Sequence, residues 1–231
     1  MMSNDWLSQS VKVSKNWLAY SRFVDNPELR INLNRQLLDD KIINADKLKD
    51  DRTTTVVRLT VEGTDTVLKR YNARSVAHKF KRALRRSRAD RCWKMSHTFA
   101  RAGLNVAMPL FMYEERFGFI CKNTYFANEY LPGDELLEVL PNMAEAEIER
   151  VVTALKEAMT RMQSNKLTHG DMKATNLLWV AGELYFVDLD AARQHLFSTS
   201  WKRANLKDRK RFLKNWQNVP ELKIAFAWMK E

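Results

Sequence analysis

Polar residues with the types and spacing of a phosphate-transfer site lie between residues 169 and 190. The first group reads His169-Gly170-Asp171-Met172-Lys173-Ala174-Thr175-Asn176, and a second acidic group, Asp188-Leu189-Asp190, follows a short apolar segment. Carboxylate and amide oxygens are the protein ligands that Mg²⁺ accepts alongside the phosphates of a substrate. The pattern therefore predicts a site for a cation and a phosphate-bearing molecule.

A β-hairpin between the two groups gives their spacing a structural meaning. Residues 177–180 and 183–187 are apolar and β-prone, and Ala181-Gly182 between them suits a tight turn. An antiparallel return brings the end of the second strand back beside the start of the first. We therefore expect Asn176 and Asp188 to lie together as the metal ligands.

The remaining residues of the motif divide into distinct chemical roles. Asp171 precedes the hairpin, where it can orient or deprotonate an attacking hydroxyl, and Lys173 can neutralise charge on the transferred phosphoryl group. His169 is expected to organise the loop. The simpler interpretation is a polar loop whose Asp and Asn only make turn hydrogen bonds. Five matching positions joined by a hairpin favour the catalytic interpretation.

The elements that must position this site follow from hydrophobic periodicity and turn residues. Residues 53–71 alternate as a β-hairpin that turns at Gly63, and a long basic helix follows, ending before Gly103. A helix with an apolar stripe from Ile148 to Met162 leads directly to the motif. Further predicted elements are strands over 106–110, 117–121 and 125–131 and a short helix over 134–140.

These elements predict an α+β fold with two lobes, divided at Pro132-Gly133. We expect an N-terminal extension over residues 1–50, a β-rich N-lobe over 51–131, and a minimal, mostly helical C-lobe over 132–231. The C-lobe carries the motif. Its shortness leaves little room for a platform that docks a peptide, which disfavours a protein kinase.

Several stretches together resemble the bacterial lipopolysaccharide core kinases, the Kdo and heptose kinases within the protein-kinase-like superfamily. They are Val67-Leu68-Lys69-Arg70-Tyr71-Asn72, Arg86-Ser87-Arg88-Ala89, Ala102-Gly103-Leu104, Asn128-Glu129-Tyr130-Leu131-Pro132-Gly133, and the motif itself. The resemblance implies ATP and Mg²⁺ as cofactors. It also implies that Lys69 holds the α- and β-phosphates and that Glu129 to Leu131 meet the adenine.

The sequence departs from the kinase pattern in two places. Cys92 stands where the helix of a kinase presents a glutamate to the strand lysine, so Lys69 has no evident carboxylate partner, and Cys92 itself is expected to be a buried apolar residue. Residues 50–55 contain no glycine, whereas the loop that covers the phosphates in kinases is glycine-rich. Either threonine and arginine side chains replace the glycine-rich loop, or the nucleotide binds weakly.

The charge of the chain predicts an anionic partner. The formal net charge is +11, and basic residues dominate two runs, one from Lys69 to Arg91 and one from Lys202 to Lys214. Such runs suit an acidic membrane face or an anionic glycolipid acceptor, such as an inner-core sugar of lipopolysaccharide. For Trp201, Phe212 and Trp216, which interleave the second run, we expect packing in the core.

Cysteine usage and hydropathy favour a cytoplasmic chain that can associate peripherally with the inner membrane. The two cysteines, Cys92 and Cys121, form no metal-ligand cluster, and no apolar stretch approaches the roughly 18 residues of a spanning helix. The main alternatives are a kinase of another small-molecule or protein acceptor and a weakly active kinase-like binding protein. A nucleic-acid-binding module ranks third, and no nucleic acid is expected as partner.

Overall fold

The computed structural model shows a mixed α/β protein whose chain separates into two compact units. It describes residues 10–14, 17–21, 42, 45–51, 53–61, 63–71, 87–117 and 120–230. The first unit comprises Met1–Lys94 and Met108–Tyr130, and the second comprises Met95–Ala107 and Leu131–Glu231. Each unit is considered separately below.

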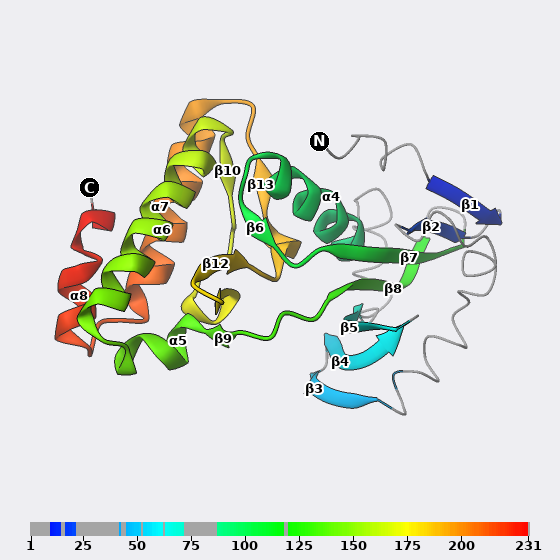
Figure 1. The fold of residues 1–231 in the computed structure, drawn as a ribbon. Helices are drawn as coiled ribbons and strands as arrows, with labels where there is room; N and C mark the ends of the chain where they lie inside the picture. Colours follow the sequence, from blue (N-terminus) through cyan, green and yellow to red (C-terminus); the bar gives the residue numbers. More distant parts are fainter. Residues whose placement is uncertain are drawn as a thin grey trace. The chain divides into compact units, whose positions relative to one another are not determined.

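A seven-stranded antiparallel sheet forms the first unit, with the order β1-β2-β7-β8-β5-β4-β3 (Figure 1). Three of its strands come from the segment before residue 51, for which the sequence predicted no elements. The strands are β1 (Ser10–Ser14), β2 (Trp17–Ser21), β3 (Asp46–Asp50), β4 (Thr54–Val61), β5 (Thr64–Tyr71), β7 (Pro109–Phe117) and β8 (Ile120–Glu129).

The predicted β-hairpin is confirmed as β4 and β5 at one side of this sheet. The strands pair continuously from Thr54 opposite Tyr71 to Val61 opposite Thr64, and Gly63 adopts the positive φ of 76° that the turn needs. Val57 and Leu68 are fully buried from opposite strands. The alternation seen in the sequence is kept in β5, where Thr66 and Leu68 are buried and Val67 and Lys69 are half-buried, whereas the first four residues of β4 are all buried.

Two predicted strands are wrong in their bounds. The segment 106–110 is divided between β6 (Asn105–Val106), which belongs to the second unit, and β7, which begins at Pro109. The segment 117–121 is divided between β7 and β8, because the chain reverses between Phe117 and Ile120, which face each other across the ladder. Short apolar runs of this kind carry no signal that separates one strand from a hairpin.

The helix after the hairpin is α4 (Arg88–Arg101), within the longer helix expected to end before Gly103. Its first turns pack Ala89, Cys92 and Trp93 against Tyr71 and neighbouring residues of the sheet. Cys92 is 2% exposed and lies 3.2 Å from the Tyr71 hydroxyl, so its expected role as a buried apolar residue is confirmed. Residues 72–86, which hold most of the first basic run, lie outside the described residues.

The second unit combines two small sheets with helices that lie before and after the motif in the sequence (Figure 1). One sheet has the order β6-β12-β11-β9 and contains β9 (Asp134–Glu135), β11 (Leu177–Val180) and β12 (Glu183–Phe186). The other pairs β10 (Leu167–Thr168) with β13 (Arg193–Gln194). The helices are α5 (Leu136–Val139), α6 (Glu145–Ser164), α7 (Ser198–Lys214) and α8 (Pro220–Ala225). Within the described residues, no helix is long and apolar enough to cross a bilayer.

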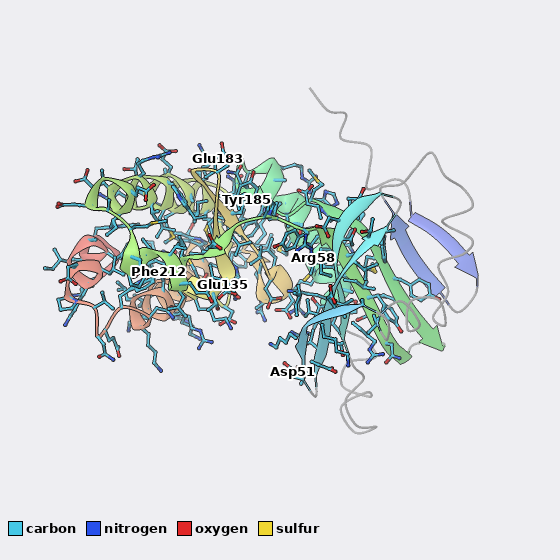
Figure 2. The ribbon with its side chains drawn as sticks, turned by 60° about the horizontal axis from the view of Figure 1, so that its bottom comes forward. Asp51, Arg58, Glu135, Glu183, Tyr185 and Phe212 are labelled. Carbon is cyan, nitrogen blue, oxygen red and sulfur yellow. The ribbon has the colours of Figure 1, made fainter. Side chains whose placement is uncertain are left out.

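The core of the second unit confirms the predicted apolar stripe of α6. Val151, Leu155 and Met162 on this helix are fully buried, together with the strands of the larger sheet. Phe212 of α7 (labelled in Figure 2) lies among the same residues. Its ring contacts those of Trp216 and Phe226 edge to face. Trp201, Phe212 and Trp216 are therefore core residues, as expected.

Replacing Leu155 with alanine should remove one of the fully buried contacts of this core. We expect the free energy of unfolding to fall by about 2–5 kcal/mol, because the surrounding side chains cannot close the cavity completely. Chemical denaturation of the variant and of Glu149→Ala, an exposed position on the same helix, provides the comparison. The control should stay within about 0.5 kcal/mol of the parent chain. Equal stabilities of the two variants would contradict this description of the core.

Candidate active site

The motif forms a loop of the second unit that runs from the end of β10 to the start of β11. Leu167 and Thr168 are in the small two-stranded sheet, and a 3₁₀ turn over Ala174–Asn176 leads into the hairpin. Asp171, Lys173 and Asn176 all lie on this loop. Asp188 follows β12 in the same unit, so the four predicted catalytic and metal residues belong to one compact unit.

The hairpin of β11 and β12 forms as predicted and returns the chain to the loop. The pairs run from Leu177 opposite Phe186 to Val180 opposite Glu183, and Ala181 and Gly182 both adopt positive φ in the turn. Beyond the last pair, the Val187 amide donates to the Asn176 carbonyl oxygen at 3.0 Å. Asp188 is the next residue after Val187, so its backbone lies beside that of Asn176.

His169 fixes the same point from the other side. Its Nε2 atom lies 3.0 Å from the Val187 carbonyl oxygen, and a carbonyl can only accept, so Nε2 carries the proton in this contact. The residue is fully buried, and its ring lies 6.2 Å from that of Phe186. Val187 is thus bonded through both its amide and its carbonyl. This geometry supports an organising role for His169.

Asp188 itself occupies a left-handed backbone conformation, with φ of 60° and ψ of 52°. Left-handed backbone is uncommon outside glycine, although Asp and Asn tolerate it better than other residues. The conformation turns the chain from β12 into the 3₁₀ turn Leu189–Ala191. Asp188 directly follows Val187, whose amide and carbonyl are both hydrogen-bonded. Strained backbone that the surrounding structure holds in place in this way is typical of a functional site.

Asn176 is 6% exposed and uses its amide nitrogen inside the loop. Nδ2 donates to the Asp171 carbonyl oxygen at 2.9 Å, which identifies that end of the side chain as nitrogen. The amide oxygen Oδ1 is then the end that can serve a cation. An amide oxygen and the Asp188 carboxylate are oxygen donors of the kind that Mg²⁺ prefers, so the residues fit this metal.

Three side chains surround the Asp171 carboxylate. The Arg211 Nε atom lies 2.8 Å from Oδ1, while the Lys173 Nζ atom lies 3.8 Å from Oδ2. Asn176 Nδ2 approaches Oδ2 at 3.5 Å. One third of the Asp171 side chain is exposed, so the carboxylate remains accessible to a substrate. Arg211 comes from α7, and its role was not predicted from the sequence.

Lys173 faces acidic side chains on two sides. Besides Asp171, it acts electrostatically on Glu135 of β9. Burial raises the pKa of Glu135, Glu138 adds to this effect, and the Lys173 ammonium opposes it. Glu135 pairs with Leu178 across the sheet, so β9 places this carboxylate next to the hairpin.

Asp208 of α7 holds the start of the loop and was also missed by the sequence analysis. Its carboxylate accepts the amide of His169 at 2.7 Å and that of Gly170 at 2.9 Å. Burial raises the pKa of this carboxyl, whereas the two amides act in the opposite direction. A side chain at Gly170 would place its Cβ 2.4 Å from the Ala191 carbonyl oxygen, so glycine is required there.

One face of α7 contacts the loop along most of its length. Trp201 donates to the Leu167 carbonyl oxygen at 2.9 Å, Asp208 binds His169 and Gly170, and Arg211 binds Asp171. Just beyond the helix, the Asn215 side chain accepts the Ala174 amide at 3.1 Å. Positions 201, 208, 211 and 215 recur at whole turns of a helix, which is the sequence signal that could have identified them.

Of the nucleotide residues predicted from the resemblance, Lys69 and Glu129 belong to the first unit and Leu131 to the second. Lys69 is half-buried on β5, where it pairs with Val56 and Phe126. The Glu129 carboxylate accepts the Met108 amide at 2.9 Å, and the Glu129 amide donates to the Met108 carbonyl. Leu131 begins the long segment of the second unit, and its carbonyl accepts the Gly133 amide.

The turn before β4 uses its own backbone amides in a different way from a glycine-rich loop. Asp51, at the end of β3, accepts the amides of Thr53 at 2.7 Å and Thr54 at 2.9 Å (Figure 2). The Thr53 amide and hydroxyl lower the pKa of the Asp51 carboxyl. These two amides are therefore engaged within the turn, which leaves side chains as the candidates to reach a phosphate.

Comparison with known proteins assigns the chain to a family. Residues 40–226 match the Lipopolysaccharide kinase (Kdo/WaaP) family. The chain belongs to this family. Among solved structures, "WaaP in complex with acyl carrier protein" is similar in fold, with a TM-score of 0.62 at 16% identity over 89% of this chain and 86% of that chain. No curated protein sequence matches the chain.

Membership in the lipopolysaccharide kinase family confirms the resemblance seen in the sequence and identifies a phosphotransferase family that uses ATP. The match covers the motif, the hairpin and α7, which are the parts that build the loop. It also covers Lys69 and the segment from Glu129 to Leu131.

Replacing Arg211 with glutamine should slow phosphate transfer from ATP. Arg211 holds one oxygen of Asp171, and an ionic hydrogen bond contributes about 1.5–3 kcal/mol when well shielded. Because half of the Arg211 side chain is exposed, we expect the lower end, roughly a tenfold fall in kcat. The ATP dissociation constant and the melting temperature should stay close to those of the parent chain.

Lys214→Gln is the matched control, since this residue is an exposed cation one turn further along the same helix. Its turnover should equal that of the parent chain. Arg211→Lys keeps the charge but cannot reproduce the planar fork, so partial activity is expected. Faster turnover of Arg211→Gln than of the parent would mean that the arginine blocks Asp171 rather than positioning it.

Proposed function

We propose that the chain is an ATP- and Mg²⁺-dependent kinase that phosphorylates a sugar hydroxyl of the lipopolysaccharide inner core. The reaction would take place at the cytoplasmic face of the inner membrane, with the chain attached peripherally. The observation that carries the proposal is the bond from the Val187 amide to the Asn176 carbonyl, which supports it by holding the backbone of Asp188 beside that of Asn176, the two proposed metal ligands. Family membership supplies the class of acceptor.

In this proposal the two units are the two lobes of a kinase-like fold. The sheet of the first unit would supply Lys69 to the α- and β-phosphates, and the segment around Glu129 and Leu131 would contact the adenine. The second unit would supply the chemistry through its loop and hairpin. Support comes from the family match and from the similar fold of WaaP.

Each residue of the loop has a separate task in the reaction. Asn176 and Asp188 would hold Mg²⁺, which, when bound, neutralises charge on the β- and γ-phosphates. Asp171 would accept a hydrogen bond from the acceptor hydroxyl and orient its oxygen toward the γ-phosphorus. Lys173, next to Asp171, would stabilise negative charge on the phosphoryl group as it is transferred.

The acceptor is the part of the proposal that depends most on the family. The formal charge of +11 suits an anionic glycolipid, and the same charge would suit other acidic molecules. Transfer from labelled ATP to purified lipopolysaccharide core fragments of defined structure tests the assignment directly. Transfer to a different small molecule, with none to the core fragments, would keep the kinase and change its acceptor.

Replacing Asp188 with alanine should abolish turnover while leaving the fold intact. The side chain is a proposed metal ligand, and alanine still permits the preceding Val187 bonds to form. We expect Mg²⁺-dependent ATP binding to be lost in calorimetry and the melting temperature to fall by only a few degrees, because alanine tolerates the left-handed backbone less well than aspartate. Equal phosphate transfer by the variant and the parent chain would remove Asp188 from the metal site.

Replacing Asp171 with asparagine should separate turnover from nucleotide binding. The substitution keeps the shape of the side chain but removes its negative charge on the acceptor side of the γ-phosphate. We expect near-normal affinity for Mg·ATP and a fall in kcat of roughly 10²–10⁴, the usual range for a positioned base. A large loss of ATP affinity, or unchanged turnover, would show that another aspartate faces the acceptor.

A further inference from the structure

Two adjacent large apolar side chains project into solvent between β13 and α7. Leu196 is 85% exposed and Phe197 is 71% exposed. Burying a leucine or phenylalanine side chain is normally favourable by about 1.5–3 kcal/mol, so a folded chain rarely leaves two neighbours out of its core. The other large apolar side chain with comparable exposure among the described residues is Ile224 on α8, at 76%.

Hydrogen bonds on both sides hold the backbone of this pair in place. The Lys166 ammonium donates to the Leu196 carbonyl oxygen at 3.2 Å. The Phe197 carbonyl oxygen accepts the Ser200 hydroxyl at 2.8 Å and the Trp201 amide at 3.1 Å, in the first turn of α7. These bonds fix the backbone from which the two side chains project.

His195, the residue before this pair, is bonded to the strand that precedes the loop of the candidate active site. Its amide donates to the Lys166 carbonyl oxygen at 2.9 Å, and its Nε2 atom lies 2.8 Å from the Thr168 hydroxyl oxygen. Trp201 donates to the Leu167 carbonyl from the other end of the segment. The backbone segment that presents Leu196 and Phe197 is therefore held at both ends against residues 166–168.

The two chain segments that meet next to the pair carry basic residues only, and one of these, Arg161, forms an ion pair with Glu157 just outside them. The end of α6 lies next to this segment, because Gln194 Nε2 donates to the Asn165 carbonyl oxygen and His195 to Lys166 (Figure 1). Segments 158–170 and 191–207 contain no Asp or Glu. Their Lys and Arg residues are Arg161, Lys166, Arg193, Lys202, Arg203 and Lys207.

We propose that Leu196 and Phe197 insert into an acidic lipid bilayer and that the surrounding Lys and Arg residues bind its headgroups. Each basic residue near an anionic surface contributes about 1 kcal/mol, and apolar side chains at the headgroup boundary add their burial. The combination of a cationic rim and an apolar tip is complementary to this surface. The proposal identifies the attachment surface for the proposed reaction, and lipid binding can be measured without phosphate transfer.

Vesicle sedimentation tests the proposal with the full chain. The parent chain should bind vesicles of an equimolar mixture of phosphatidylcholine and phosphatidylglycerol and should bind phosphatidylcholine vesicles weakly. The double variant Leu196→Ser, Phe197→Ser should bind the mixed vesicles about ten- to a hundredfold more weakly. Ile224→Ser, which removes an equally exposed apolar side chain elsewhere in the unit, should bind like the parent chain.

A second pair of variants tests the cationic rim. Lys202→Gln with Arg203→Gln should weaken binding to the mixed vesicles about tenfold at low ionic strength, and the difference should shrink as salt is added. Lys210→Gln with Lys214→Gln, at the far end of α7, changes the net charge equally and should have a much smaller effect. Equal losses in the two pairs would reduce the interaction to net charge and overturn the proposal.

The double apolar variant also separates this inference from the proposed reaction. Leu196 and Phe197 lie outside the catalytic loop, so transfer to soluble core fragments should be unchanged. If the parent chain transfers no phosphate but binds vesicles as expected, the proposed reaction fails and the docking surface stands. If the double variant keeps vesicle binding and loses binding to purified acyl carrier protein, the surface is a protein interface and the proposal is wrong.

Discussion

Asp208 makes the interaction on which the loop of the candidate active site depends. Its carboxylate accepts the backbone amides of His169 and Gly170, which are the first residues of the loop. Burial raises the pKa of this carboxyl because it disfavours the charged form. The hydrogen bonds from the two amides act in the opposite direction and stabilise the charge. The loop therefore starts from a fixed position on α7, and α7 is itself anchored in the core by Phe212 and Trp201.

The positions of the other functional groups follow from that start. With His169 fixed, its ring reaches the Val187 carbonyl, and the Val187 amide reaches Asn176. The end of the hairpin is thereby held against the loop, and the strained backbone of Asp188 lies at the junction. Arg211, one helical turn after Asp208, adds the contact to the Asp171 carboxylate. A single helix face thus holds the Asp171 carboxylate, and β12 leads to Asp188, the second proposed metal ligand.

The sequence was informative where the signal is local. The alternation of β4 and β5, the apolar stripe of α6 and the turn at Ala181-Gly182 all depend on neighbouring residues, and each was predicted with the correct type of element. The strands β1 to β3 were not predicted, because β2 and β3 form by pairing with β7 and β4 rather than from a strong pattern of their own. The split of β7 from β8 was missed because a run of apolar residues does not show where a strand reverses.

The site showed the same division between local and distant information. Asp171, Asn176 and Asp188 were recognised by their spacing around a hairpin, and the structure brings the backbones of Asn176 and Asp188 together as that spacing requires. Asp208 and Arg211 were missed because a helix rich in lysine and arginine looks like a solvated or membrane-facing surface. Only their spacing with Trp201 reveals a common face, and that spacing acquires meaning once the loop is known to lie against it.

The way in which α7 holds the loop also bears on how such a site can change. Asp208 and Asn215 bind amides of the main chain, and Trp201 binds a carbonyl. Nearly every residue type has these backbone groups, so the path of the loop does not depend on which side chains it carries at positions such as 171 and 173. Substitutions there can alter chemistry or acceptor preference while the scaffold persists. Because α7 binds only backbone groups at these points, the side chains that would carry the chemistry can be replaced without loss of the loop's path. One fold can in this way diversify its substrates over evolution.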